Sequence, residues 1–116
     1  DVNNDDIYIP ANTLQYKVVY DFIAEEEMNV FQLFSHAHSN MTEFRVYTTG
    51  GENDGELVYI TYDWEHPPIK EFDPPLVLES GQGFRLETTY DNPSSNSLQF
   101  GLRSTDEMMI LFGAYY

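Results

Sequence analysis

The 116-residue sequence contains no cysteine. This absence excludes disulfide bonds, thiolate nucleophiles and thiolate metal sites together. Any transition-metal site in the chain must therefore use histidine, methionine or carboxylate ligands.

Basic residues are also scarce, since five Lys and Arg stand against twenty Asp and Glu and the formal net charge is −15 at pH 7. A surface with this charge repels the phosphates of nucleic acids and anionic lipid headgroups, and it attracts cations. Nucleic acid is therefore not an expected partner. The charge alone identifies no ligand, because an acidic surface also keeps secreted or salt-tolerant proteins soluble.

Long hydrophobic runs are missing too. The longest apolar stretches, such as MMILFGAYY at residues 108–116, are too short to cross a bilayer, so no membrane span is expected. A chain of 116 residues that is 41% hydrophobic can bury one core but is too short for two domains. We therefore expect a single domain over residues 1–116.

Helical spacing is absent, and the chain instead shows the two-residue period of half-buried strands. In LQYKVVYDF this period places five side chains on one face, namely Leu14, Tyr16, Val18, Tyr20 and Phe22. Further strands are predicted at residues 28–38, 43–49, 55–63, 75–79, 83–90, 97–102 and 107–116. Turns rich in Gly, Pro, Asn and Asp separate them, among them HPPIKEFDPP at residues 66–75. The pattern predicts an all-β fold, an antiparallel β-sandwich or jelly roll of about eight or nine strands.

Two of the three histidines, His36 and His38, lie two residues apart in FSHAHSNMTEF. Residues i and i+2 of a strand point to the same side, about 6.6 to 7 Å apart, so both imidazoles can bind one metal ion. A solvated strand face explains the same spacing. The predicted face also carries Val30, Gln32 and Phe34, so it begins apolar and ends in two histidines. A third ligand is needed to decide between the two interpretations.

The candidates for a third ligand are Met108 and Met109. Because they are adjacent, they point to opposite faces of a strand, and only one of them can face the histidines. Two imidazoles and one thioether suit an ion that cycles between Cu(I) and Cu(II), whereas zinc more often recruits a third His, a Cys or a carboxylate. Methionine is also a common core residue, so the residues alone leave both roles open.

Five segments occur in a fixed order: LFSHAHSNMTEFRV, YDWEHPPIKEF, LESGQGFRL, YDN and GLRSTDEMM. In order and spacing they resemble the C-terminal copper-binding domain of the type II copper, ascorbate-dependent monooxygenases, the family of peptidylglycine alpha-hydroxylating monooxygenase and dopamine beta-hydroxylase. The resemblance extends from IYIPAN to the end of the sequence. It implies one copper ion per chain, with His36 and His38 as imidazole ligands of the oxygen-activating copper and Met108 as its thioether ligand.

The resemblance also implies that Met109 and His66 are not copper ligands. Met109 stands where some members of the family carry a cysteine, and Thr88 stands at the position of that cysteine's disulfide partner. Both halves of a disulfide are thus replaced, and Met109 is expected to pack inward. His66 matches no copper ligand and is expected at the surface or in a turn.

In the family, a second domain holds another copper through three histidines and supplies the second electron. Only His66 is left here once the first site is filled, so this chain cannot build that site. The resemblance therefore implies C–H hydroxylation only if a partner, a neighbouring domain or a small reductant such as ascorbate supplies the electron. Whether the chain is an enzyme stays open.

Two other functions remain open. One is a copper carrier or sequestration protein on the same fold, without oxygen chemistry. The other is a metal-free β-sandwich module that binds carbohydrate or protein. The acidic turn GGENDGE lacks the ligand spacing of a calcium loop. Copper chemistry and the acidic surface favour an extracytoplasmic location, periplasmic or secreted.

Overall fold

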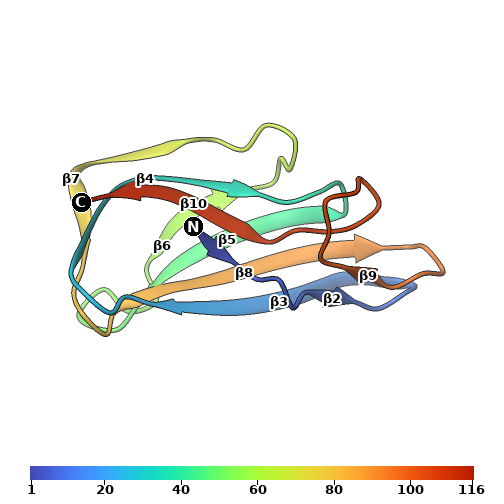
Figure 1. Cartoon of the computed structure of the whole chain (residues 1–116), viewed down its shortest axis with the longest axis horizontal. Coiled ribbons are helices and arrows are strands. Elements are labelled where there is room, and N and C mark those ends of the chain that lie inside the picture. Colours follow the sequence, from blue (N-terminus) through green and yellow to red (C-terminus); the bar gives the residue numbers. More distant parts are fainter.

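Ten β-strands make up the protein in a computed structural model that describes all 116 residues (Figure 1). Their bounds are β1 Val2–Asn3, β2 Tyr8–Ile9, β3 Thr13–Ile23, β4 Met28–His36, β5 Met41–Thr49, β6 Leu57–Thr61, β7 Lys70–Leu78, β8 Gly83–Asn92, β9 Leu98–Gln99 and β10 Ile110–Tyr115. The structure contains no helix able to cross a membrane.

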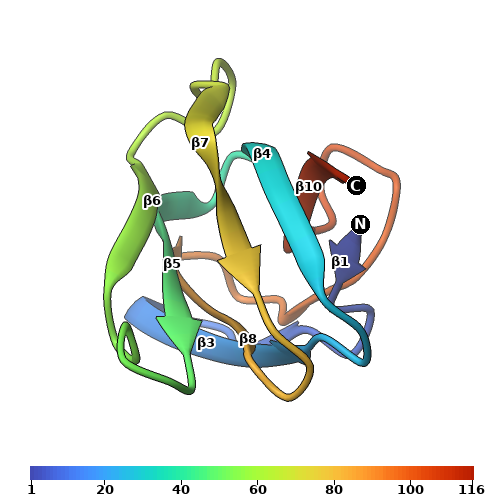
Figure 2. The same ribbon diagram turned by 90° about the vertical axis from the view of Figure 1, so that its left-hand side faces the viewer.

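Two four-stranded antiparallel sheets face each other, one in the order β1-β10-β4-β7 and the other in the order β3-β8-β5-β6 (Figure 2). A separate two-stranded ribbon pairs β2 with β9. The predicted all-β antiparallel sandwich is confirmed, and the jelly-roll topology stays a prediction. The two strands that the sequence pattern missed, β1 and β2, have two residues each.

A single cluster of 17 buried hydrophobic residues lies between the sheets. Every second side chain along a strand points into this cluster. On β5, for example, Phe44 and Val46 are fully buried, and Arg45 between them is not. Phe44 meets Tyr59 of β6 edge to face, with ring centroids 6.5 Å apart. Each sheet thus presents one face to the core and one to solvent.

The predicted inward face of β3 is correct in part. Three of its side chains pack against the core: Tyr16, Val18 and Phe22. Leu14 is 64% exposed, because the pairing of β3 with β8 shifts register between Thr13 and Tyr16 and interrupts the alternation. Tyr20 is 36% exposed on this edge strand.

The segment at residues 66–75 was expected to be a turn, but its second half belongs to β7. This strand begins at Lys70 and includes Pro74 and Pro75. Proline is compatible with a strand here because β7 is the edge of its sheet and its pairing with β4 shifts register between Val30 and Gln32. The same irregularity turns Val30 into the core, so Val30 does not share a face with His36 and His38 as predicted.

Candidate metal centre

The candidate site lies where β4 ends and the segment before β10 begins. The antiparallel register pairs His36 with Ile110, the last pair of the two strands, and His38 and Met108 each lie two residues beyond it. Ala37 and Met109 belong to the core cluster, whereas His36, His38 and Met108 lie outside that cluster.

Met109 points the other way. It is 0% exposed and belongs to the core cluster, whereas Met108 is 6% exposed and lies outside that cluster. The Nδ2 of buried Asn4 donates to the Met109 sulfur at 3.5 Å. The prediction that Met109 packs inward is confirmed. Thr88, expected at the other replaced cysteine position, is also fully buried.

The two imidazoles are close enough to bind the same ion. Their ring centroids are 5.4 Å apart and the ring planes are almost perpendicular. An ion bound about 2.0 Å from a ring nitrogen lies about 3.2 Å from the ring centroid, so two rings up to about 6.4 Å apart can share it. The separation of His36 and His38 falls within this limit.

The surroundings of His36 favour its neutral imidazole. Partial burial, and then the nearby charge of His38, both lower its pKa below the ordinary value of 6.5. A metal ion needs the unprotonated ring, so the lowered pKa leaves a nitrogen lone pair available.

His38 is oriented by a backbone oxygen. Its Nδ1 lies 2.9 Å from the carbonyl oxygen of Asp106, and a carbonyl can only accept. Nδ1 is therefore the donor, and Nε2 is the nitrogen that carries the lone pair in the neutral ring. Metal-binding histidines commonly use such a hydrogen bond to fix the tautomer, so this arrangement fits a metal ligand.

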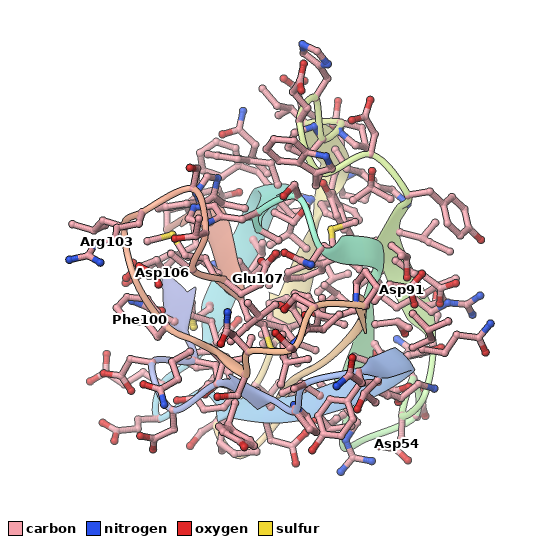
Figure 3. All side chains as sticks on the ribbon, turned by 90° about the vertical axis from the view of Figure 1, so that its right-hand side faces the viewer. Asp54, Asp91, Phe100, Arg103, Asp106 and Glu107 are labelled. Carbon is pink, nitrogen blue, oxygen red and sulfur yellow. The ribbon has the colours of Figure 1, made fainter.

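Glu107, labelled in Figure 3 near Asp106, contacts both the loop after β4 and the segment before β10. Its side chain is 0% exposed, and its Oε1 accepts the backbone N–H groups of His38 at 2.8 Å and Met108 at 3.0 Å. Its Oε2 accepts the N–H of Asn40 at 2.8 Å. Burial raises the pKa of Glu107, and the three N–H donors act in the opposite direction. One carboxylate thus holds the loop after β4 against the segment before β10.

Tyr90 completes the support of Met108 from the other sheet. Its buried hydroxyl donates to the Met108 carbonyl oxygen at 2.7 Å. The backbone N–H and carbonyl of Met108 therefore both have side-chain partners, Glu107 and Tyr90. Ligands held in this way need little reordering on binding.

Sequence reasoning had placed Glu107 only as a neighbour of Met108 in the TDEMM segment and had not assigned it a role. A local signal was available, since an acidic residue directly precedes the apolar run of residues 108–112. An acidic residue in this position either lies in solvent at the end of a strand or is buried and accepts hydrogen bonds from nearby donors. The sequence alone does not distinguish these two cases.

No group of three or more His, Asp or Glu side chains is arranged to hold a metal ion. The side chain of His66 is 77% exposed on the loop between β6 and β7, with Asp63 and Glu65 at 3.9 and 3.8 Å. This is the surface position that was predicted.

Neither a scan of protein-family models nor a search of curated proteins finds a match to this chain. The fold is an antiparallel β-sandwich, and His36, His38 and Met108 lie where the pairing of β4 with β10 ends. The resemblance to the ascorbate-dependent monooxygenases stays a prediction from the five sequence segments.

Proposed function

We propose that the protein is a mononuclear copper-binding domain in which His36, His38 and Met108 hold one copper ion. The observation that supports this proposal is the histidine pair, with ring centroids 5.4 Å apart, together with the Glu107 side chain that accepts the backbone N–H groups of both His38 and Met108. Imidazole serves both oxidation states of copper, and the soft thioether favours Cu(I). The absence of any three-residue His and carboxylate cluster argues against zinc.

Copper bound here would supply one-electron redox chemistry and, by the resemblance, oxygen activation for C–H hydroxylation. The chain itself orients the ligands: the Asp106 carbonyl sets the tautomer of His38, and Glu107 and Tyr90 hold the backbone of Met108. Only His66 is left beside the proposed ligands, so the chain has too few histidines for a second copper site, and the other electron would come from a partner domain or a small reductant such as ascorbate. An extracytoplasmic location belongs to the same proposal.

A copper titration followed by electron paramagnetic resonance tests the site. We expect one tight equivalent of Cu(II) with a type II, nitrogen-coordinated signal, which His36→Ala abolishes because it removes one imidazole. His66→Ala is the matched control, since it removes an exposed histidine that is not a candidate ligand, and it should leave the signal unchanged. Weak binding at many carboxylates, equal in all three proteins, would overturn the proposal.

The thioether is tested with Met108→Leu, which nearly keeps the volume and removes the sulfur. Cu(I) affinity, measured by competition with a chromophoric chelator, should fall at least about tenfold more than Cu(II) affinity, because the soft ligand mainly stabilises Cu(I). An equal loss for both oxidation states would remove Met108 from the ligand set.

The exposure of His36 also suits a second candidate function, a copper carrier, because a ligand at the surface can pass the ion to another protein. Oxygen consumption driven by ascorbate distinguishes the two. A carrier consumes no oxygen beyond that consumed by the same amount of free copper and ascorbate, whereas a monooxygenase-like domain couples consumption to a hydroxylated product.

A further inference from the structure

The hydroxyl of Tyr59 joins the two sheets directly beside the candidate metal centre. Tyr59 lies on β6, is 2% exposed and belongs to the core cluster. Its hydroxyl contacts Ser35 of β4 in the opposite sheet, and Ser35 directly precedes His36. The same hydroxyl lies 2.8 Å from the carbonyl oxygen of Pro68, in the loop of residues 62–69 that connects β6 to β7 (Figure 2). Three segments therefore meet at one oxygen atom.

The hydrogen-bonding capacity of this hydroxyl is fully used. A carbonyl oxygen can only accept, so the Tyr59 hydroxyl donates its one hydrogen to Pro68. The backbone N–H of Ser35 donates to the Tyr59 oxygen at 3.1 Å. The Ser35 hydroxyl also lies 3.1 Å from it and is then the donor in that contact, because the Tyr59 hydrogen is already used. A hydroxyl offers one hydrogen and two lone pairs, and all three have protein partners here.

The hydroxyl takes the place of a direct contact between two strands. The last pair of β4 and β7 is Leu33 with Lys70, and the same register continued by two residues would pair Ser35 with Pro68. Proline has no N–H group, so it cannot complete a hydrogen-bonded strand pair. Tyr59 instead accepts from the Ser35 N–H and donates to the Pro68 carbonyl oxygen. Ser35 is therefore held even though the pairing with β7 has already ended.

The strand is fixed on both of its edges at this point. On the other edge, β4 pairs with β10 through Ser35–Leu111 and His36–Ile110. The Tyr59 hydroxyl holds the edge that β7 leaves, one residue before His36. A metal site depends on such support, because its ligands have to stay within about 0.5 Å of the binding geometry.

We propose that Tyr59 is a positioning residue of the candidate metal centre. Its hydroxyl fixes the backbone of β4 at Ser35 and so sets the direction in which the His36 imidazole is presented to the ion. Tyr59 itself is not a ligand. This role rests on the proposed copper site, since it acts through one of the three proposed ligands.

The variant Tyr59→Phe tests the role, because it removes the hydroxyl and keeps the ring that packs edge to face against Phe44. The full chain is titrated with Cu(II) in competition with a chelator, and the bound ion is examined by electron paramagnetic resonance. The variant should bind Cu(II) about tenfold more weakly than the wild type. The parallel hyperfine splitting of its signal should also change, because the His36 ring is no longer held in one direction.

Two control variants remove hydroxyl groups that do not contact β4. Tyr47→Phe removes a phenol that accepts a hydrogen bond from Arg45, and Thr48→Val removes a buried hydroxyl that donates to the Asn53 carbonyl oxygen. Thr48→Val lowers the free energy of unfolding, as Tyr59→Phe does, because each leaves a hydrogen-bonding partner unsatisfied. Both controls should keep the Cu(II) affinity within about twofold of the wild type and the signal unchanged.

Amide hydrogen exchange in the metal-free protein tests the contact at Ser35 without copper. The Ser35 N–H loses its acceptor in Tyr59→Phe, so it should exchange at least about tenfold faster than in the wild type. The amide of Leu86 serves as the internal reference for global unfolding, because Leu86 is paired on both sides, with Tyr20 and with Val46. The increase at Ser35 should exceed any increase at Leu86 by that factor.

Four outcomes would contradict the proposal at different points. A wild type without one tight copper equivalent would overturn the proposed copper site and the role of Tyr59 with it. A wild type that binds copper, together with a Tyr59→Phe variant of equal affinity and unchanged signal, would overturn the positioning role alone. An equal loss in Thr48→Val would attribute the effect to global stability. Unchanged exchange at Ser35 would show that the hydroxyl does not hold the strand.

Discussion

At the scale of single residues, Glu107 determines the geometry of the candidate centre without being a candidate ligand. Burying a carboxylate is costly unless donors replace its hydration, and here three backbone N–H groups from two separate segments do so. The backbones of His38 and Met108 are therefore held by the same side chain. This contact explains why a buried acid directly precedes an apolar run.

Glu107→Gln should lower the free energy of unfolding of the metal-free protein by about 2–3 kcal/mol. The amide has one oxygen and one NH₂ group, so at least one backbone N–H at Glu107 would face a donor instead of an acceptor. Urea unfolding measures the change. Glu65→Gln, an exposed control, should stay within about 0.5 kcal/mol of the wild type, and an equally small effect of Glu107→Gln would contradict the assigned role.

At the scale of elements, basic and acidic side chains form ion pairs on the outer face of the β3-β8-β5-β6 sheet. Three of the five basic residues lie on this face, and each contacts a carboxylate, in the pairs Lys17–Glu87, Arg45–Glu43 and Arg85–Asp21. Asp21 and Arg85 are direct partners in the β3–β8 register and make two hydrogen bonds, at 2.8 and 3.1 Å. Opposite charges placed across a strand pair favour one register over a shifted one.

The Asp21–Arg85 pair gives a pH-dependent prediction. The hydrogen bond from Arg85 lowers the pKa of Asp21 below its ordinary value of 3.8, so the pair stabilises the fold above that pH. This contribution is lost as the pH falls through the lowered pKa. Because both side chains are about half exposed, Asp21→Asn should cost no more than about 1 kcal/mol at pH 7 and about nothing near pH 2. Urea unfolding at both pH values measures this, and a cost that persists in acid would refute it.

At the scale of the whole molecule, the charge is unevenly distributed. The three ion pairs leave one sheet face nearly neutral, so the net charge of −15 is carried by the rest of the surface, including the turn at residues 25–27. Self-repulsion of this kind destabilises the compact state and at the same time limits self-association. It also favours cationic ligands over anionic ones.

Salt should therefore stabilise the protein. Between about 10 mM and about 500 mM NaCl the screening length falls from about 30 Å to less than about 8 Å, which weakens the repulsion between distant carboxylates. We expect Tm to rise by about 2–5 °C in thermal unfolding followed by circular dichroism. The rise should be smaller in E25Q/E26Q/E27Q. A Tm that falls with salt would mean that the ion pairs outweigh the repulsion.

Much of the fold was predictable from the sequence because alternation and turn composition are local properties. The strands predicted at residues 28–38, 43–49 and 83–90 correspond to β4, β5 and β8 within a few residues. The predictions that were wrong concern properties that depend on neighbouring strands and not on local sequence. β1, β2 and the first half of β7 are strands because a partner lies beside them, and Leu14 and Val30 leave their predicted faces at register shifts between neighbouring strands.

The sequence by itself determined the β class, the positions of the main strands, the same-side spacing of His36 and His38 and the opposite directions of Met108 and Met109. Each of these follows from the two-residue period of a strand. Only the tertiary structure decided that Met108 lies at the same end of the sheet as the histidines, because this depends on the pairing of β4 with β10 across most of the chain. The burial of Glu107 was decided in the same way, since it depends on which segments meet after folding.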